Sequence, residues 1–188
     1  MISVSILNKT LARLLAVGAL GITTSAVIAA TTTPRANLHH LMKDLVAVQT
    51  QAIWDVGNNA QDDDGNPDAS KIKPTDWSRL IQAGSQVKEA AQFLAQAKRV
   101  NVASAGEAID DEEDPGALNA KGVQALIQAN PAEFRAFAAA LSASMDEVLT
   151  AARAKDAIKL ADVSGRLDEV CESCHKQFWY PEPKPNSH

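Results

Sequence analysis

Apolar side chains in residues 36–180 recur every three or four positions along four long stretches, and this period limits the fold more than any other feature of the chain. Such a repeat puts its apolar members on one face of an α-helix. No stretch alternates apolar and polar residues in the way that a half-buried β-strand does. The predicted helices cover about 36–56, 74–98, 130–152 and 156–180, with a short helix over 119–128.

Local signals predict where these helices begin and end. Gly57-Asn58-Asn59 favours a stop after the first helix, and Thr75 favours an N-cap for the second. Asn130-Pro131 favours the start of the third helix, and Asp156 can cap the fourth. Four amphipathic helices without strands predict an all-α fold, an antiparallel up-down four-helix bundle that can hold a cofactor between facing helices.

The first thirty residues have the pattern of a secretory signal peptide. Lys9 and Arg13 form a basic start, an apolar run follows over 14–22, and small residues lead to a cleavage point after Ala29 or Ala30. The run is shorter than the ~20 residues that a membrane span needs. We therefore expect export to the periplasm and no membrane span after the signal peptide is cleaved.

Residues 31–188 are long enough for one domain with its own core, and we expect a single domain there. Removing the signal peptide takes away two bases and no acid, so the formal net charge changes from −5 to −7. An acidic chain is unsuited to nucleic acid and favours protein partners with a basic surface. The sequence leaves the oligomeric state open and is compatible with a homodimer.

The two cysteines lie in the sequence Cys171-Glu172-Ser173-Cys174-His175, on the apolar stripe of the last predicted helix. On a helix, positions i, i+3 and i+4 fall within about a quarter turn of each other. Cys-x-x-Cys-His is the attachment pattern of a c-type haem. Cys171 and Cys174 can form thioethers with the two haem vinyl groups, and His175 can ligate the iron. We predict one covalent haem c per chain.

Three other uses of this motif are weaker. A thioredoxin-like pair would lie at a helix N-terminus after a strand, but this pair is near the end of a helix. A structural zinc site needs a fourth ligand, which would have to come from His39, His40 or His188. A plain disulfide would not need His175.

The signal peptide, the four helices and a Cys-x-x-Cys-His motif on the last helix resemble the class II cytochromes c, the cytochrome c′-like bundle proteins. The resemblance covers about residues 38–181 and includes Leu41-Met42-Lys43, since the first helix of that family often carries a methionine near its start. The aromatic tail 176–181 is similar to that of a proteobacterial subgroup. The family usually has an arginine four residues before the methionine, where this chain has Leu38. The resemblance implies periplasmic electron transfer, or binding of a small gas where the sixth iron position is open.

The sixth iron ligand separates these two functions. Met42 is the predicted distal ligand, opposite His175, because a thioether gives a low-spin iron and a raised potential suited to electron transfer. His39 and His40 are the competing ligands, and an open site is the third alternative. On a helix, His40 and Met42 are about 200° apart, so at most one of them can face the haem, whereas His39 is about 60° from Met42.

We therefore expect a one-electron carrier between unidentified redox partner proteins, and not an enzyme, since no catalytic triad, paired-carboxylate cleft or phosphate-binding loop is evident. The alternative is a five-coordinate haem protein that binds NO or CO. Trp54, Trp77 and Trp179 are expected in the core or a pocket wall, with an indole N–H bound to a haem propionate as the functional alternative. Segment 101–117, which carries an acidic run over 110–114, is expected to be an exposed loop, or alternatively an acidic docking patch.

Overall fold

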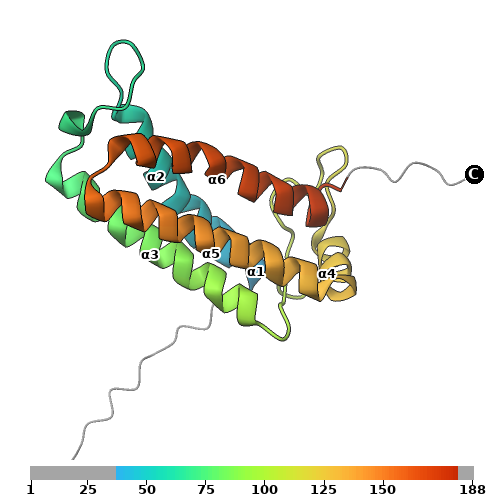
Figure 1. The fold of residues 1–188 in the computed structure, drawn as a ribbon. Coiled ribbons are helices and arrows are strands. Elements are labelled where there is room, and N and C mark those ends of the chain that lie inside the picture. Colours follow the sequence, from blue (N-terminus) through green and yellow to red (C-terminus); the bar gives the residue numbers. More distant parts are fainter. Residues whose placement is uncertain (1–36, 182–188) are drawn as a thin grey trace, which may run out of the picture. The chain divides into compact units, whose positions relative to one another are not determined.

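The computed structural model describes residues 37–181, and the regular structure in this range is helical (Figure 1). The elements are α1 (Leu38–His40), the π-helical turn η1 (Leu41–Val46), α2 (Ala47–Asn59), the 3-10 turn η2 (Ala69–Lys71), α3 (Pro74–Gln96), α4 (Ala120–Ala129), α5 (Pro131–Ala154) and α6 (Ala157–Phe178). These residues contain no β-strand, and an isolated bridge pairs Gln61 with Pro67. The predicted all-α class is confirmed, whereas the predicted signal peptide lies outside the described residues.

The helices surround one apolar core. α3 packs most extensively against α5, and α6 packs against both α5 and α2. α2 also contacts α3, and the short α4 touches α5 and α6. Figure 1 shows that α6 ends at the same end of the helical body at which α1 begins. Among the described helices, none is both long and apolar enough to cross a bilayer.

The apolar stripes predicted for α3, α5 and α6 are confirmed, because their members are buried or partly buried in this core. Met145 and Leu167, near the middle of α5 and α6, are both 0% exposed. Gly84 lies on the buried face of α3, and a Cβ there would lie 3.3 Å from Cδ2 of Leu149. The missing side chain thus lets α3 and α5 approach closely, which explains their extensive contact.

The first helix departs from a regular period at η1. The N–H of Ala47 bonds to the C=O of Met42, five residues back, so this turn holds one residue more than an α-helical turn. Leu41 and Val46 are consequently both buried although they are five apart, and Val48 is 53% exposed. In the sequence, steps of four and three from Leu41 through Leu45 predict that Val48 lies on the buried stripe. That prediction is wrong, because an inserted residue shifts the buried face.

The predicted N-caps have mixed outcomes. Asp156 is the N-cap of α6, and its side chain accepts the N–H of a residue in the first turn. Thr75, predicted as the cap of α3, lies inside that helix, which begins at Pro74. The cap is Lys73, whose N–H donates to the carboxylate of Asp76 at 3.1 Å. Proline at the first helical position, where no N–H is needed, moves the helix start ahead of the threonine.

Candidate functional site

Cys171 and Cys174 lie one turn apart on α6 and pack against the core. Both carry free thiols. Burial, with a smaller contribution from Asp168, raises the pKa of Cys171 to about 11, and burial raises the pKa of Cys174 to about 12. Such thiols stay protonated at neutral pH and lack the thiolate character of a thioredoxin-like redox pair.

His175 lies in a partly buried aromatic corner at the end of α6. Its ring is 5.2 Å from the ring of Trp179, in an edge-to-face arrangement, and 6.1 Å from that of Tyr180. Burial lowers the pKa of His175, and nearby Glu172 partly opposes that shift. The Tyr180 hydroxyl in turn donates to the Glu172 carboxylate. A lowered pKa favours the neutral imidazole, which is the form that ligates metal ions.

Trp179 carries a buried indole N–H with no hydrogen-bond partner among the described residues. Trp54, in contrast, donates to the C=O of Ser164 at 3.1 Å, and Trp77 is buried in the core. A buried donor without a partner costs about 1–3 kcal/mol. This N–H lies on the ring next to His175, so residues 37–181 leave one donor without a partner beside the motif.

Met42 lies in the η1 turn and packs against the same core as Cys171 and Cys174. It is partly buried, whereas Met145 is fully enclosed on α5. π-helical turns are rare and recur at functional sites, which sets this methionine apart from a regular core residue. Ligation of iron by Met42 and His175 remains a prediction.

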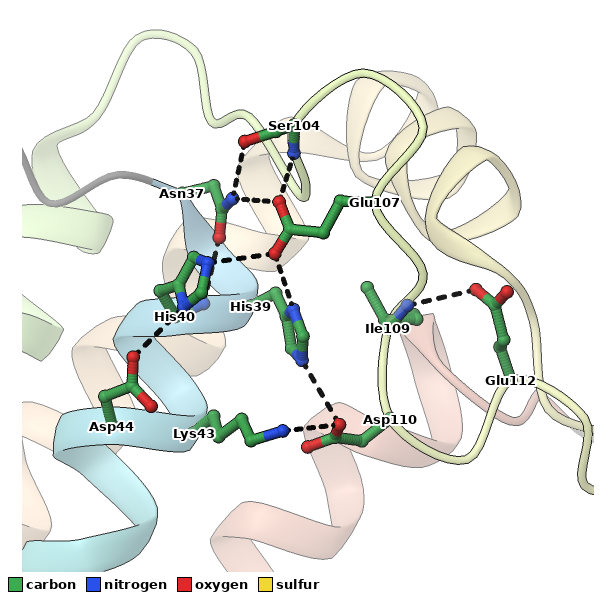
Figure 2. A network of polar contacts seen from close by, with 10 residues as sticks. All are labelled: Asn37, His39, His40, Lys43, Asp44, Ser104, Glu107, Ile109, Asp110 and Glu112. Carbon is green, nitrogen blue, oxygen red and sulfur yellow. Dashed lines mark hydrogen bonds and ion pairs between the residues drawn. The ribbon is translucent and has the colours of Figure 1, made fainter.

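His39 and His40, the competing ligands, both face carboxylates (Figure 2). Nδ1 of His39 lies 3.1 Å and Nε2 of His40 lies 2.9 Å from Oε1 of Glu107. Nδ1 of His40 lies 3.0 Å from Asp44, and Nε2 of His39 lies 3.5 Å from Asp110, without hydrogen-bond geometry. These contacts engage both ring nitrogens of His40 and Nδ1 of His39, which disfavours His40 as a ligand. The buried Nε2 of His39 has no hydrogen-bond partner among the described residues, so His39 stays the competing histidine.

The segment 101–118 is a mostly exposed loop, as predicted, but parts of it are fixed to the core and to the first helix. Val102 and Ile109 are buried in the core, and the side chains of Glu107 and Asp110 turn to the first helix (Figure 2). Sequence reasoning missed Glu107, because its partner Asn37 lies 70 residues away in the chain. The available signal was the pair of apolar residues in an otherwise polar segment.

A cavity of about 310 Å³ lies away from the motif, between the end of α2 and the start of α3. It is lined by Asp55, Val56, Asn59, Lys71, Ile72, Lys73, Asp76 and Arg79. Its lining mixes bases and acids and includes none of the predicted cofactor residues. The cavity therefore plays no part in the candidate site.

The groups around the motif fit a covalently attached haem. Two free thiols lie one turn apart, a partly buried imidazole follows on the same helix, and an unpaired indole N–H is available to an anionic group. A zinc site fits less well, because His39 and His40 are held by carboxylates and His188 lies outside the described residues.

Comparison of the whole chain with protein-family models, with curated proteins and with solved structures gave no match.

Proposed function

We propose that this protein is a periplasmic monohaem c-type cytochrome that carries one electron at a time between redox partner proteins. In this proposal Cys171 and Cys174 hold the haem covalently, His175 is the proximal ligand of the iron, and Met42 is the distal ligand. The helix formed by α1, η1 and α2 would combine with α3, α5 and α6 in an antiparallel up-down four-helix bundle. Each of these helices contacts two of the others, which supports that arrangement.

The observation that carries the proposal is the set of groups gathered at the C-terminal end of α6. Cys171 and Cys174 share a core with Met42, and His175 follows one residue after the second cysteine. Beside them the buried N–H of Trp179 has no hydrogen-bond partner in the part of the chain that the structure describes. Neither a disulfide nor a structural zinc site would use this indole donor, whereas a haem propionate would.

Each residue has a distinct task in this site. The thiols of Cys171 and Cys174 would hold the haem through thioether bonds to its two vinyl groups, which would fix it to the helix that also carries His175. The neutral imidazole of His175 offers a nitrogen to the iron, and the surrounding aromatic rings limit the access of water. The thioether of Met42 would complete the coordination and favour the reduced state. When bound, the haem supplies a metal centre that accepts and releases one electron.

The test is a visible spectrum of the protein after export to the periplasm of a bacterial host that has the c-type cytochrome maturation machinery. The reduced protein is examined before and after addition of CO. The proposal predicts sharp low-spin bands that persist at CO concentrations sufficient to saturate a five-coordinate haem, because two side chains would already ligate the iron and CO would have to displace Met42.

A broad high-spin spectrum that shifts with CO would overturn the electron-carrier function and favour the five-coordinate alternative that binds NO or CO. A low-spin spectrum with bis-histidine character would keep the carrier function and would exclude Met42 as the ligand. The absence of any haem spectrum from correctly exported protein would remove both haem functions.

A further inference from the structure

The segment 101–118, which we call the strap, joins the two parts of the proposed haem site. At its start, the N–H groups of Leu38 and His39 donate to the C=O groups of Asn101 and Val102, at 2.8 and 2.9 Å. At its end, the N–H of Leu118 donates to the C=O of Trp179 at 2.8 Å. The strap therefore bridges the turn that precedes Met42 and the aromatic corner that holds His175.

Glu107 is the central anchor of the strap (Figure 2). One oxygen of its carboxylate accepts the N–H of Ser104 at 2.7 Å and the side-chain amide of Asn37 at 2.9 Å. Its other oxygen lies between the rings of His39 and His40. The Ser104 hydrogen bond, followed by that from His39, lowers the pKa of Glu107 to about 2, so the anchor is an anion across the physiological pH range.

Asp110 is a second anchor of the strap, and it binds a residue of the η1 turn. Its carboxylate accepts a hydrogen bond from Nζ of Lys43 at 2.8 Å. Lys43 directly follows Met42, so this contact ties the strap to the proposed distal ligand's own turn. The two anchors hold residues on both sides of Met42 from outside the helix.

A π-helical turn needs such support. It departs from the regular ladder of hydrogen bonds, and helices seldom contain one without a functional or packing reason. A methionine thioether is a weak iron ligand on a flexible side chain, so its ligation depends on how well its backbone is held.

We propose that Glu107 and Asp110 are positioning residues that act through the strap to hold the η1 turn, and thereby keep Met42 ligated to the iron. This inference rests on the proposed function. In this inference the acidic strap strengthens the bond between Met42 and iron. External ligands such as CO would then displace Met42 less easily.

The test compares haem-loaded Glu107→Ala with a matched control, Glu147→Ala. Glu147 is also a carboxylate held by a cation, accepting from Arg166 at 2.7 Å, but it joins α5 to α6 far along the chain from Met42. CO competes with a methionine for the iron, so the apparent affinity for CO measures how firmly Met42 is held. We expect Glu107→Ala to bind CO about tenfold more tightly than wild type, because part of the free energy of the lost contacts of Glu107 would no longer hold the η1 turn, and we expect Glu147→Ala to match wild type.

Hydrogen exchange provides a second measurement that does not depend on haem chemistry. In Glu107→Ala we expect faster amide exchange in residues 38–46 and 101–118, and unchanged exchange in α5. Asp110→Asn tests the same claim at an exposed contact if Glu107→Ala does not fold, and we expect it to change CO affinity in the same direction.

The outcomes separate the two proposals. Faster exchange in the strap with unchanged CO affinity would overturn the positioning role and leave the proposed function intact. An equal rise of CO affinity in Glu147→Ala would also overturn it, because the effect would then be one of general stability. A low-spin wild-type protein with a histidine in place of the methionine ligand would refute the positioning role and keep the carrier function, whereas a high-spin wild-type protein would refute both.

Discussion

Three neighbouring side chains of the first helix have different surroundings, although they are close in sequence: His39, His40 and Met42. The two imidazoles face Glu107, whereas the thioether packs with the apolar core that includes Cys171. A carboxylate next to an imidazole competes with a metal for the same nitrogen, and a thioether has no such competitor. These surroundings favour Met42 as the proposed distal ligand over His40, both of whose ring nitrogens face carboxylates.

Met42→Ala should convert the reduced protein from low spin to high spin and allow CO to bind, because the iron loses its sixth ligand. The side-chain truncation should also lower the free energy of unfolding by about 2 kcal/mol. A visible spectrum with and without CO checks the first effect. Met145→Leu, at the fully buried methionine of α5, is the control and should leave the spectrum unchanged. An unchanged low-spin spectrum in Met42→Ala would contradict the assignment.

Trp179→Phe should lower the reduction potential of the haem-loaded protein by roughly 20–60 mV, where 59 mV corresponds to a tenfold change for one electron. The variant removes the unpaired N–H that we assign to a haem propionate, and an unneutralised propionate favours the oxidised iron. Trp54→Phe is the matched control, since its N–H is bound to the C=O of Ser164. Equal potentials in wild type and Trp179→Phe would show that the indole does not serve the cofactor.

The π-helical turn η1 determines which face of α2 is buried. Val46 is buried and Val48 is 53% exposed, the reverse of what a regular helical period from Leu41 predicts. Val46→Ser should therefore lower the free energy of unfolding by about 2 kcal/mol, and Val48→Ser should change it by less than about 0.5 kcal/mol. Urea unfolding of both variants measures the difference. The opposite order would mean that the first helix has no inserted residue.

Sequence patterns predict helices well where the period is regular, as in α3, α5 and α6. They fail at η1, because an inserted residue shifts the buried face and a regular period cannot represent it. They also misplace the cap of α3, where Pro74 at the first helical position outweighs Thr75. The first error concerns the helical period and the second a choice between two local start signals.

Across the protein as a whole, the sequence predicts more of the core than of the contacts around the candidate site. Apolar stripes are local and periodic, so the helices and most of their buried residues could be derived. The Cys171–His175 motif is local too. The anchoring of Glu107 and the unpaired indole of Trp179 depend on contacts between segments distant in the chain, which no local pattern encodes.

The formal net charge of −7 expected after removal of the signal peptide predicts how the rate of electron transfer would depend on the charge of the redox partner. Oxidation of the reduced protein by a cationic cobalt(III) complex should slow as salt rises from low concentration to ~0.5 M, because the ions screen the attraction. Oxidation by anionic ferricyanide should accelerate over the same range. Stopped-flow rates measure both, and the same sign of salt dependence for the two oxidants would contradict an acidic electron-transfer surface.

Every functional proposal above depends on a covalent haem at Cys171 and Cys174, and the mass of the intact protein under denaturing conditions decides whether it is there. After export and maturation, the mass should equal that of residues 30–188 or 31–188 plus one haem. That added mass should survive acid–acetone extraction and disappear in the double variant Cys171→Ser, Cys174→Ser. A mature wild-type chain at the mass of the polypeptide alone would refute the covalent haem.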